Sequence, residues 1–219
     1  MSLQEKQPIV ITNDLDGVHI KAPTPLTTLR KLLTRQYKIP DEIFEVTPYA
    51  SPTSIIGKGL ERITAITHRN RRINPEGISG LRTLSEIAQA HKREIHLMAL
   101  SGRIKPVHQV THQDLGPQYE EIFVRWLLNE STSSAMWKEY KARQLISEGF
   151  TVVHLEDDLN PALRMARIKN VHVYLFRNFS NNPWLLKWAG IELPENVIPV
   201  RSFEEVNTDF NRKLLLDII

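Results

Sequence analysis

Two carboxylates separated by one residue follow an apolar run near the start of the chain. The run 8–13 is rich in β-branched residues, and Asp14 and Asp16 come directly after it, followed by Gly17. Apolar residues without alternation predict a strand covered on both faces, and the glycine permits a tight turn at its end. Two carboxylates placed there could attack an electrophile, bind a divalent cation or move a proton. A solvated turn is the alternative, because Asp and Gly are common in turns.

Three later segments carry groups that could join this pair in one site. Residues 101–103, Ser-Gly-Arg, follow the apolar run 95–100 and offer a hydroxyl and backbone amides to a phosphoryl oxygen. Lys141 stands shortly before the apolar run 151–155, which leads into the acidic cluster 156–158. Buried carboxylates this close repel one another unless a proton or a cation compensates them. The acidic cluster therefore favours a bound cation.

This ordered set resembles the haloacid dehalogenase-like hydrolase superfamily, over residues 8–22 and 78–200. The four segments that are similar to the four family motifs are Ile9 to Val18, Leu97 to Ser101, Lys141, and Val152 to Asp158.

The resemblance implies a role for each of these residues. Asp14 would be the nucleophile that forms an aspartyl-phosphate, and Asp16 would protonate the leaving group and then activate water. The phosphoryl group would be held by Ser101, Gly102, Arg103 and Lys141. Mg²⁺ would be bound by Asp14, the backbone carbonyl of Asp16, Asp157 and Asp158. Oxygen ligands in a chain without cysteine also favour Mg²⁺ over softer metals.

Several positions separate the branches of the superfamily. The dehalogenases of the superfamily resemble its phosphatases but lack an acid two positions after the nucleophile. The presence of Asp16 at that position therefore favours phosphoryl chemistry. Residues 16–18, Asp-Gly-Val, also occur in nucleotidase-like members. Pro161 stands where the fourth motif commonly carries a second Asp. Either Asp158 supplies that carboxylate, or one metal contact is missing.

Two lysines compete for the third motif. Lys138 and Lys141 both precede the run 151–155 at a suitable distance. We prefer Lys141, because Leu145 and Ile146 follow it in the usual helical register.

The apolar pattern of the whole chain predicts an α/β fold, a Rossmann-like, doubly wound, mainly parallel sheet. Strands are expected at 8–13, 95–100, 151–155, 171–176 and 196–200. Helices are expected at 26–37, 59–69, 78–92, 118–129, 137–147 and 161–168. The segment 118–129 has its apolar residues at helical spacing.

We expect a small helical cap inserted after the first strand. Residues 23–75 carry helical patterns and Pro-rich punctuation but no convincing strand. The core would then comprise residues 1–22 and 76–219. A cap at that position would cover the carboxyl edge of the sheet, where open α/β sheets bind ligands.

Composition excludes several classes of protein. The absence of cysteine excludes disulfide frameworks, thiolate metal sites and cysteine nucleophiles. No apolar run approaches the roughly 20 residues that span a bilayer, and residues 1–8 lack the apolar core of a signal peptide. We therefore expect a cytoplasmic protein without membrane contact.

These features together predict a magnesium-dependent phosphomonoester hydrolase that acts on a small phosphorylated substrate, with a nucleotide as first candidate. One alternative is a non-catalytic relative that binds a phosphorylated ligand or a protein partner. Another is a phosphatase acting on nucleic-acid ends, for which the basic run 68–72 could recruit an anionic substrate. Nucleic acid is less favoured, because a net charge of +3 over 219 residues is a weak field. The basic run is more typical of a helix carboxyl end, where positive charge complements the helix dipole.

Overall fold

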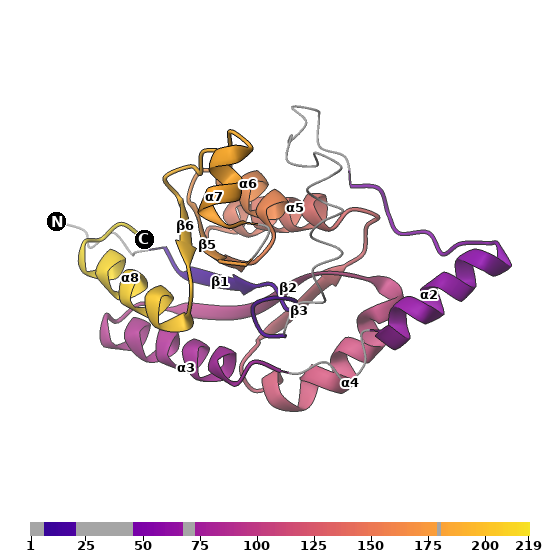
Figure 1. The fold of residues 1–219 in the computed structure, drawn as a ribbon. Helices are drawn as coiled ribbons and strands as arrows, with labels where there is room; N and C mark the ends of the chain where they lie inside the picture. The colour runs from indigo at the N-terminus through magenta and orange to yellow at the C-terminus, as the bar shows by residue number, and fades with distance from the viewer. Residues whose placement is uncertain (1–6, 21–45, 68–72, 179–180) are drawn as a thin grey trace.

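A six-stranded parallel sheet forms the centre of the molecule, with the order β3-β2-β1-β4-β5-β6 (Figure 1). The computed structural model describes residues 7–20, 46–67, 73–178 and 181–219. The strands are β1 (Ile9–Asn13), β2 (Ile95–Ile104), β3 (Arg125–Asn129), β4 (Thr151–Glu156), β5 (Val171–Phe176) and β6 (Val197–Val200). The chain moves outward from β1 to β3 and then returns to β4 on the other side of β1. This reversal confirms the predicted doubly wound α/β fold and places the switch point beside β1.

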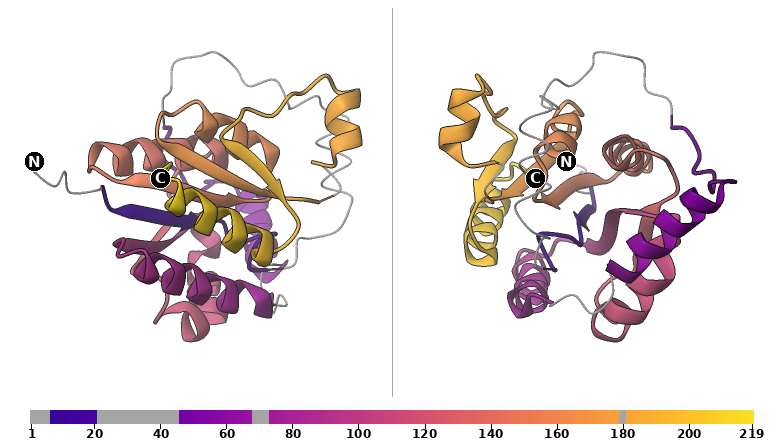
Figure 2. Two further views of the ribbon diagram at one scale, coloured as in Figure 1. Left: turned by 90° about the vertical axis from the view of Figure 1, so that its left-hand side faces the viewer. Right: turned by 45° about the vertical axis from the view of Figure 1, so that its right-hand side comes forward.

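Helices cover both faces of the sheet (Figures 1 and 2). One face carries α3 (Pro75–Ala90), α4 (His108–Tyr119) and α8 (Phe203–Leu215), and the other carries α5 (Ser134–Ser147), α6 (Leu159–Ala166) and α7 (Pro183–Trp188). Ile9 and Ile11 pack into the first core, whereas Val10 between them packs into the second. Two-sided burial explains why β1 is apolar without alternation. None of the helices in the described ranges has the length and apolar character needed to cross a bilayer.

The helix predicted at 118–129 is wrong. Tyr119 ends α4, which begins at His108, and Trp126 belongs to β3, where it pairs with Ala99 of β2. The helical spacing of apolar residues has another cause. Tyr119 stacks on Phe123 with ring centroids 5.2 Å apart, and Phe123 meets Trp126 edge-on at 5.4 Å. The periodicity thus reflects an aromatic cluster in a turn, and pairing with β2 overrides local helical propensity.

The segment between β1 and β2 contains α2 (Ile55–Thr67), which packs against the short helix η1 (Lys105–Val107) beside α4 (Figure 1). Before α2 the chain pairs with a distant segment, because the amide of Tyr49 donates to the carbonyl of Glu130 at 2.8 Å. The expected helix 26–37 and the basic run 68–72 lie outside the described residues. The cap boundaries 23–75 stay a prediction.

Candidate active site

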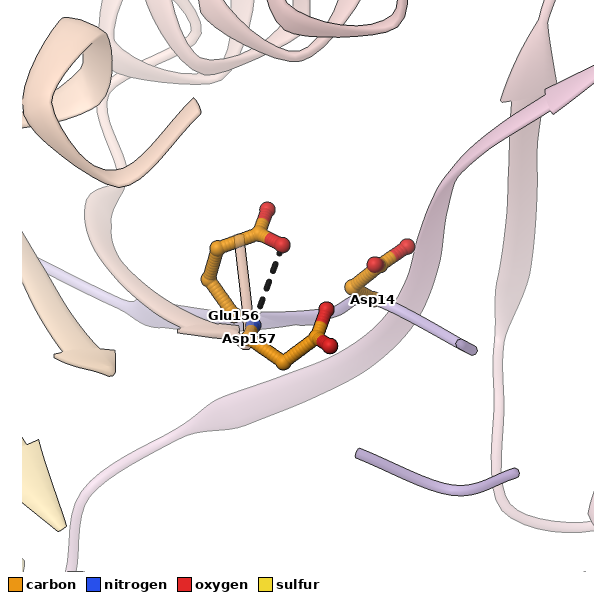
Figure 3. Close-up of side chains that lie close together, drawn as sticks. All are labelled: Asp14, Glu156 and Asp157. Atoms are coloured by element: carbon orange, nitrogen blue, oxygen red, sulfur yellow. Dashed lines mark hydrogen bonds between the residues drawn. The ribbon is translucent and has the colours of Figure 1, made fainter. Parts of the chain in front are cut away.

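Three carboxylates meet at the carboxyl ends of β1 and β4 (Figure 3). The two strands are direct neighbours, and the amide of Asp14 donates to the carbonyl of Leu155 at 2.9 Å. Candidate ligand oxygens of Asp14, Glu156 and Asp157 all lie within 4.8 Å of one another. Asp14 and Glu156 are buried and Asp157 is partly buried. The first and fourth predicted motifs therefore converge.

Lys138, and not Lys141, lies against these carboxylates. Its Nζ is 3.1 Å from Asp14 Oδ1 and 2.6 Å from Glu156 Oε2, and its side chain is buried. Lys141 instead donates to Gln144 at 3.0 Å and stands over the Trp137 ring at 4.7 Å. The structure thus differs from our preference between the two lysines.

The register of α5 explains this placement. Lys138, Ala142 and Leu145 follow i, i+4, i+7 spacing and are all buried against the sheet. This spacing was the sequence feature that could have identified Lys138.

Glu156 is held through both of its carboxylate oxygens. Oε2 accepts from Lys138 and, at 3.0 Å, from Nε2 of His154, while Oε1 accepts from the backbone amides of Asp157 and Asp158 at 3.0 Å each. The buried His154 also meets Thr12 Oγ1 at 2.8 Å through Nδ1. Burial alone would raise the pKa of Glu156, but Lys138 and His154 lower it overall. Glu156 is thus an ionised anchor for Lys138 rather than an available ligand.

The other two carboxylates are electrostatically strained. Burial raises the pKa of Asp14 to about 8, although Lys138 opposes the shift. Burial, together with the charges of Asp14 and Glu156, raises the pKa of Asp157 well above its ordinary value. Burial on its own would lower the pKa of Lys138, but Asp14 and Glu156 raise it. Because one ammonium faces three carboxylates in this cluster, added positive charge would stabilise it.

Asp157 is positioned by residues that the sequence reasoning missed. Asn178 Nδ2 donates to the Asp157 carbonyl at 2.7 Å and to its Oδ2 at 3.3 Å, and Asn181 Nδ2 donates to the same carbonyl at 3.0 Å. Gly17 also packs closely against Asp157: a Cβ at Gly17 would lie 1.9 Å from Asp157 Oδ2, and the φ of Gly17 is +82°. Both asparagines follow β5, and an Asn pair after a strand end was the available sequence feature.

Asp158 has a different position from Asp157. Its side chain accepts a hydrogen bond from the amide of Asn160 at 3.3 Å and caps α6. It does not belong to the group of three carboxylates described above. Pro161 is buried inside the same helix.

The second motif lies at the end of β2, close to Asp16. Arg103 donates to both carboxylate oxygens of Asp16, from Nε at 3.0 Å and from Nη2 at 2.9 Å. Ser101 is buried, and its Oγ accepts from the Arg103 amide at 3.2 Å. Gly102 packs on the start of α5, where a Cβ would lie 1.9 Å from Ser134 Oγ. The carboxyl end of β2 is thereby joined to the helix that carries Lys138.

The chain is similar to known proteins in its three-dimensional structure. No protein-family model matches the sequence, and no curated protein matches it. A haloacid dehalogenase-like hydrolase from Burkholderia xenovorans LB400 is similar with a TM-score of 0.54 and 15% identity, over 96% of this chain and 99% of that one. The chain has the fold of the haloacid dehalogenase-like hydrolases.

Other solved structures with this fold carry different names. One described as a phosphoglycolate phosphatase, from Lactobacillus delbrueckii subsp. bulgaricus, has a TM-score of 0.53 and 13% identity over 94% of this chain and 98% of its own. One described as a β-phosphoglucomutase, from Thermotoga maritima, has a TM-score of 0.51 and 16% identity over 93% and 99%. At such identities the likeness carries the fold, and the reaction must be argued from the site.

Proposed function

We propose that the protein is a magnesium-dependent phosphomonoester hydrolase that works through an aspartyl-phosphate on Asp14. The observation that carries the proposal is that Asp14, Lys138 and Asp157 converge at one edge of the sheet. Asp16 follows Asp14 by two positions in the chain. This set supplies a nucleophile, a compensating cation, metal ligands and a proton donor. A small phosphomonoester is the substrate class, and a nucleotide remains the first candidate within it.

The reaction has two balanced steps. In the first, an oxygen of Asp14 attacks the substrate phosphorus, the bond from phosphorus to the leaving oxygen breaks, and Asp16 gives that oxygen its proton. In the second, water attacks the phosphorus and gives a proton to Asp16, and the bond from phosphorus to Asp14 breaks. Inorganic phosphate leaves, and both aspartates return to their starting states.

Lys138 has a defined part in this scheme. Its ammonium contacts Asp14 and is fixed by Glu156, which is itself fixed by His154 and two backbone amides. A fixed positive charge at this place favours the ionised form of Asp14 and stabilises the charge that develops on the phosphoryl oxygens. We therefore assign to Lys138 the role that the sequence argument gave to Lys141.

The donor set fits Mg²⁺. Asp14 and Asp157 have raised pKa values and candidate oxygens within 4.8 Å of each other, so a cation would relieve an existing electrostatic penalty. These two carboxylates and the backbone carbonyl of Asp16 would hold the ion. When bound, Mg²⁺ supplies positive charge that neutralises phosphoryl oxygens. Glu156 is excluded from our ligand set because both of its oxygens already accept hydrogen bonds.

The test is phosphate release from a panel of phosphomonoesters, measured with Mg²⁺ and again with a chelator. We expect release only with Mg²⁺, and loss of turnover by several orders of magnitude in Asp14→Asn, since an amide cannot form the acyl-phosphate. Wild-type protein that binds phosphorylated ligands without releasing phosphate would refute the proposal and favour a non-catalytic binding protein.

A further inference from the structure

The guanidinium of Arg103 forms a two-point contact with Asp16 at the carboxyl edge of the sheet. Nε and Nη2 donate to the two different oxygens of that carboxylate, at 3.0 and 2.9 Å. Parallel bonds of this kind fix the plane of a carboxylate as well as its position. The two residues are 87 positions apart in the chain, one after β1 and the other on β2.

Arg103 is itself held rigidly. Its Nη1 donates to Thr111 Oγ1 at 2.9 Å, and Thr111 in turn donates to the carbonyl of Val107 at 2.8 Å. The Arg103 side chain is 2% exposed, whereas that of Asp16 is 27% exposed. The arginine is thus a buried support, and the carboxylate is the member of the pair that faces outward.

This arrangement disagrees with a phosphate-binding role for Arg103. An arginine binds a phosphoryl group best through the edge formed by two of its nitrogens. In Arg103 the Nε–Nη2 edge is occupied by Asp16, and Nη1 is directed to Thr111. The contacts are those of a residue that orients another side chain.

We infer that Arg103 is a positioning residue that holds the Asp16 carboxylate in place for proton transfer to the leaving group. This inference rests on the proposed phosphatase function and deepens it. A carboxylate has about four lone-pair sites on its two oxygens, and a two-point contact that fixes the plane of the group also fixes the direction in which an oxygen presents the transferred proton. Proton transfer requires that the acid lie within hydrogen-bond distance of the leaving oxygen. Without the contact from Arg103, the partly exposed side chain of Asp16 would keep that position poorly.

The dependence of rate on the leaving group separates positioning from phosphate binding. Nitrophenolate leaves p-nitrophenyl phosphate without needing a proton, whereas the alkoxide of glycerol 3-phosphate needs one. We would measure kcat/KM for both substrates with saturating Mg²⁺, and the inhibition constant of inorganic phosphate. The variant Arg103→Lys keeps the charge but loses the two-point contact.

We expect Asp16→Asn to lower kcat/KM for glycerol 3-phosphate by about 10²- to 10⁴-fold, and that for p-nitrophenyl phosphate far less. We define the substrate ratio as kcat/KM for glycerol 3-phosphate divided by kcat/KM for p-nitrophenyl phosphate. Arg103→Lys should lower this ratio at least about tenfold, which is within the range of general acid catalysis. The inhibition constant of phosphate should change less than about threefold, since the phosphoryl contacts are made elsewhere. In an Asp16→Asn background, Arg103→Lys should leave the ratio unchanged, because its effect passes through Asp16.

Arg93→Lys is the matched control. Arg93 is a partly buried arginine that donates to the carbonyls of Ile219 and Gln7, at the opposite edge of the sheet from Asp16. It should leave the substrate ratio unaltered.

Three results would overturn the inference: equal losses of kcat/KM on both substrates, a raised inhibition constant for phosphate, or an effect of Arg103→Lys on the ratio that persists in the Asp16→Asn background.

If Arg103→Lys does not fold, as judged by thermal melting, Thr111→Val carries the same test. It should lower the ratio at least about threefold by loosening Arg103, and an unchanged ratio would refute the positioning role. An inactive wild-type protein would refute the proposed function together with this inference. An active wild-type protein whose substrate ratio does not change in Arg103→Lys would refute this inference but not the proposed function.

Discussion

Replacing Lys138 with Met removes an ammonium group from two buried carboxylates and keeps the apolar stem. The ammonium lies 3.1 Å from Asp14 Oδ1 and 2.6 Å from Glu156 Oε2. Breaking a buried ion pair by removing one partner costs about 3–5 kcal/mol, because the remaining charge is uncompensated. Asp14 already has a pKa of about 8 and can take up a proton at neutral pH, so Glu156 carries most of the penalty. We therefore expect the lower part of that range, about 3 kcal/mol.

The assay is urea unfolding of the metal-free protein at pH 7, combined with phosphate release in Mg²⁺. Lys138→Met should lose about 10²- to 10³-fold in kcat, the usual effect of removing one transition-state donor. Lys141→Met is the matched control on the same helix, since Lys141 contacts Gln144 and the Trp137 ring rather than the carboxylates. It should cost no more than about 1 kcal/mol, the size of an exposed cation–π contact, and leave kcat nearly intact.

A second substitution tests the electrostatic origin of the loss. Glu156→Gln in the Lys138→Met background removes the uncompensated charge, and should recover a measurable part of the lost unfolding free energy. The reasoning fails if Lys138→Met unfolds at the wild-type urea concentration. It fails equally if Lys141→Met has the larger effect on kcat.

Three further predictions concern individual residues. Asp14→Asn should remove turnover but preserve the circular dichroism spectrum and the binding of inorganic phosphate; retained turnover would exclude Asp14 as nucleophile. Gly17→Ala should weaken Mg²⁺ activation, because the new Cβ would lie 1.9 Å from Asp157 Oδ2. Gly149 also has a positive φ, of +92°, but has open space around it, so Gly149→Ala should lower only the melting temperature. Equal Mg²⁺ dependence in the two variants would contradict this prediction. Burial lowers the pKa of His19 from 6.5 to about 3, so the unfolded chain binds a proton in that interval that the folded protein does not. From pH 7 to pH 5 this residue should cost about 2 kcal/mol of unfolding free energy, and His19→Gln should show a flatter pH dependence by that amount; an identical acid slope would refute it.

Local patterns predicted most of the sheet and much of the site. The apolar runs that were expected as strands all appear, because a strand buried on both faces needs apolar residues at every position. Asp14 and Asp157 could be predicted to meet because both follow strands of one parallel sheet. The segment 118–129 failed, because its aromatic spacing suits a helix and an aromatic cluster equally well, and only the presence of β2 alongside decides between them.

The sequence by itself determined the five expected strands, the strand ends that carry the carboxylates, and the oxygen-rich chemistry of the cluster. These properties depend on residue type and on short-range periodicity, which are written locally in the chain. Tertiary structure decided which lysine faces Asp14, how Asn178 holds Asp157, and that Arg103 donates to both carboxylate oxygens of Asp16. Each of these contacts joins side chains from separate elements, so the partner of each group depends on how helices and strands pack, which one stretch of sequence does not specify.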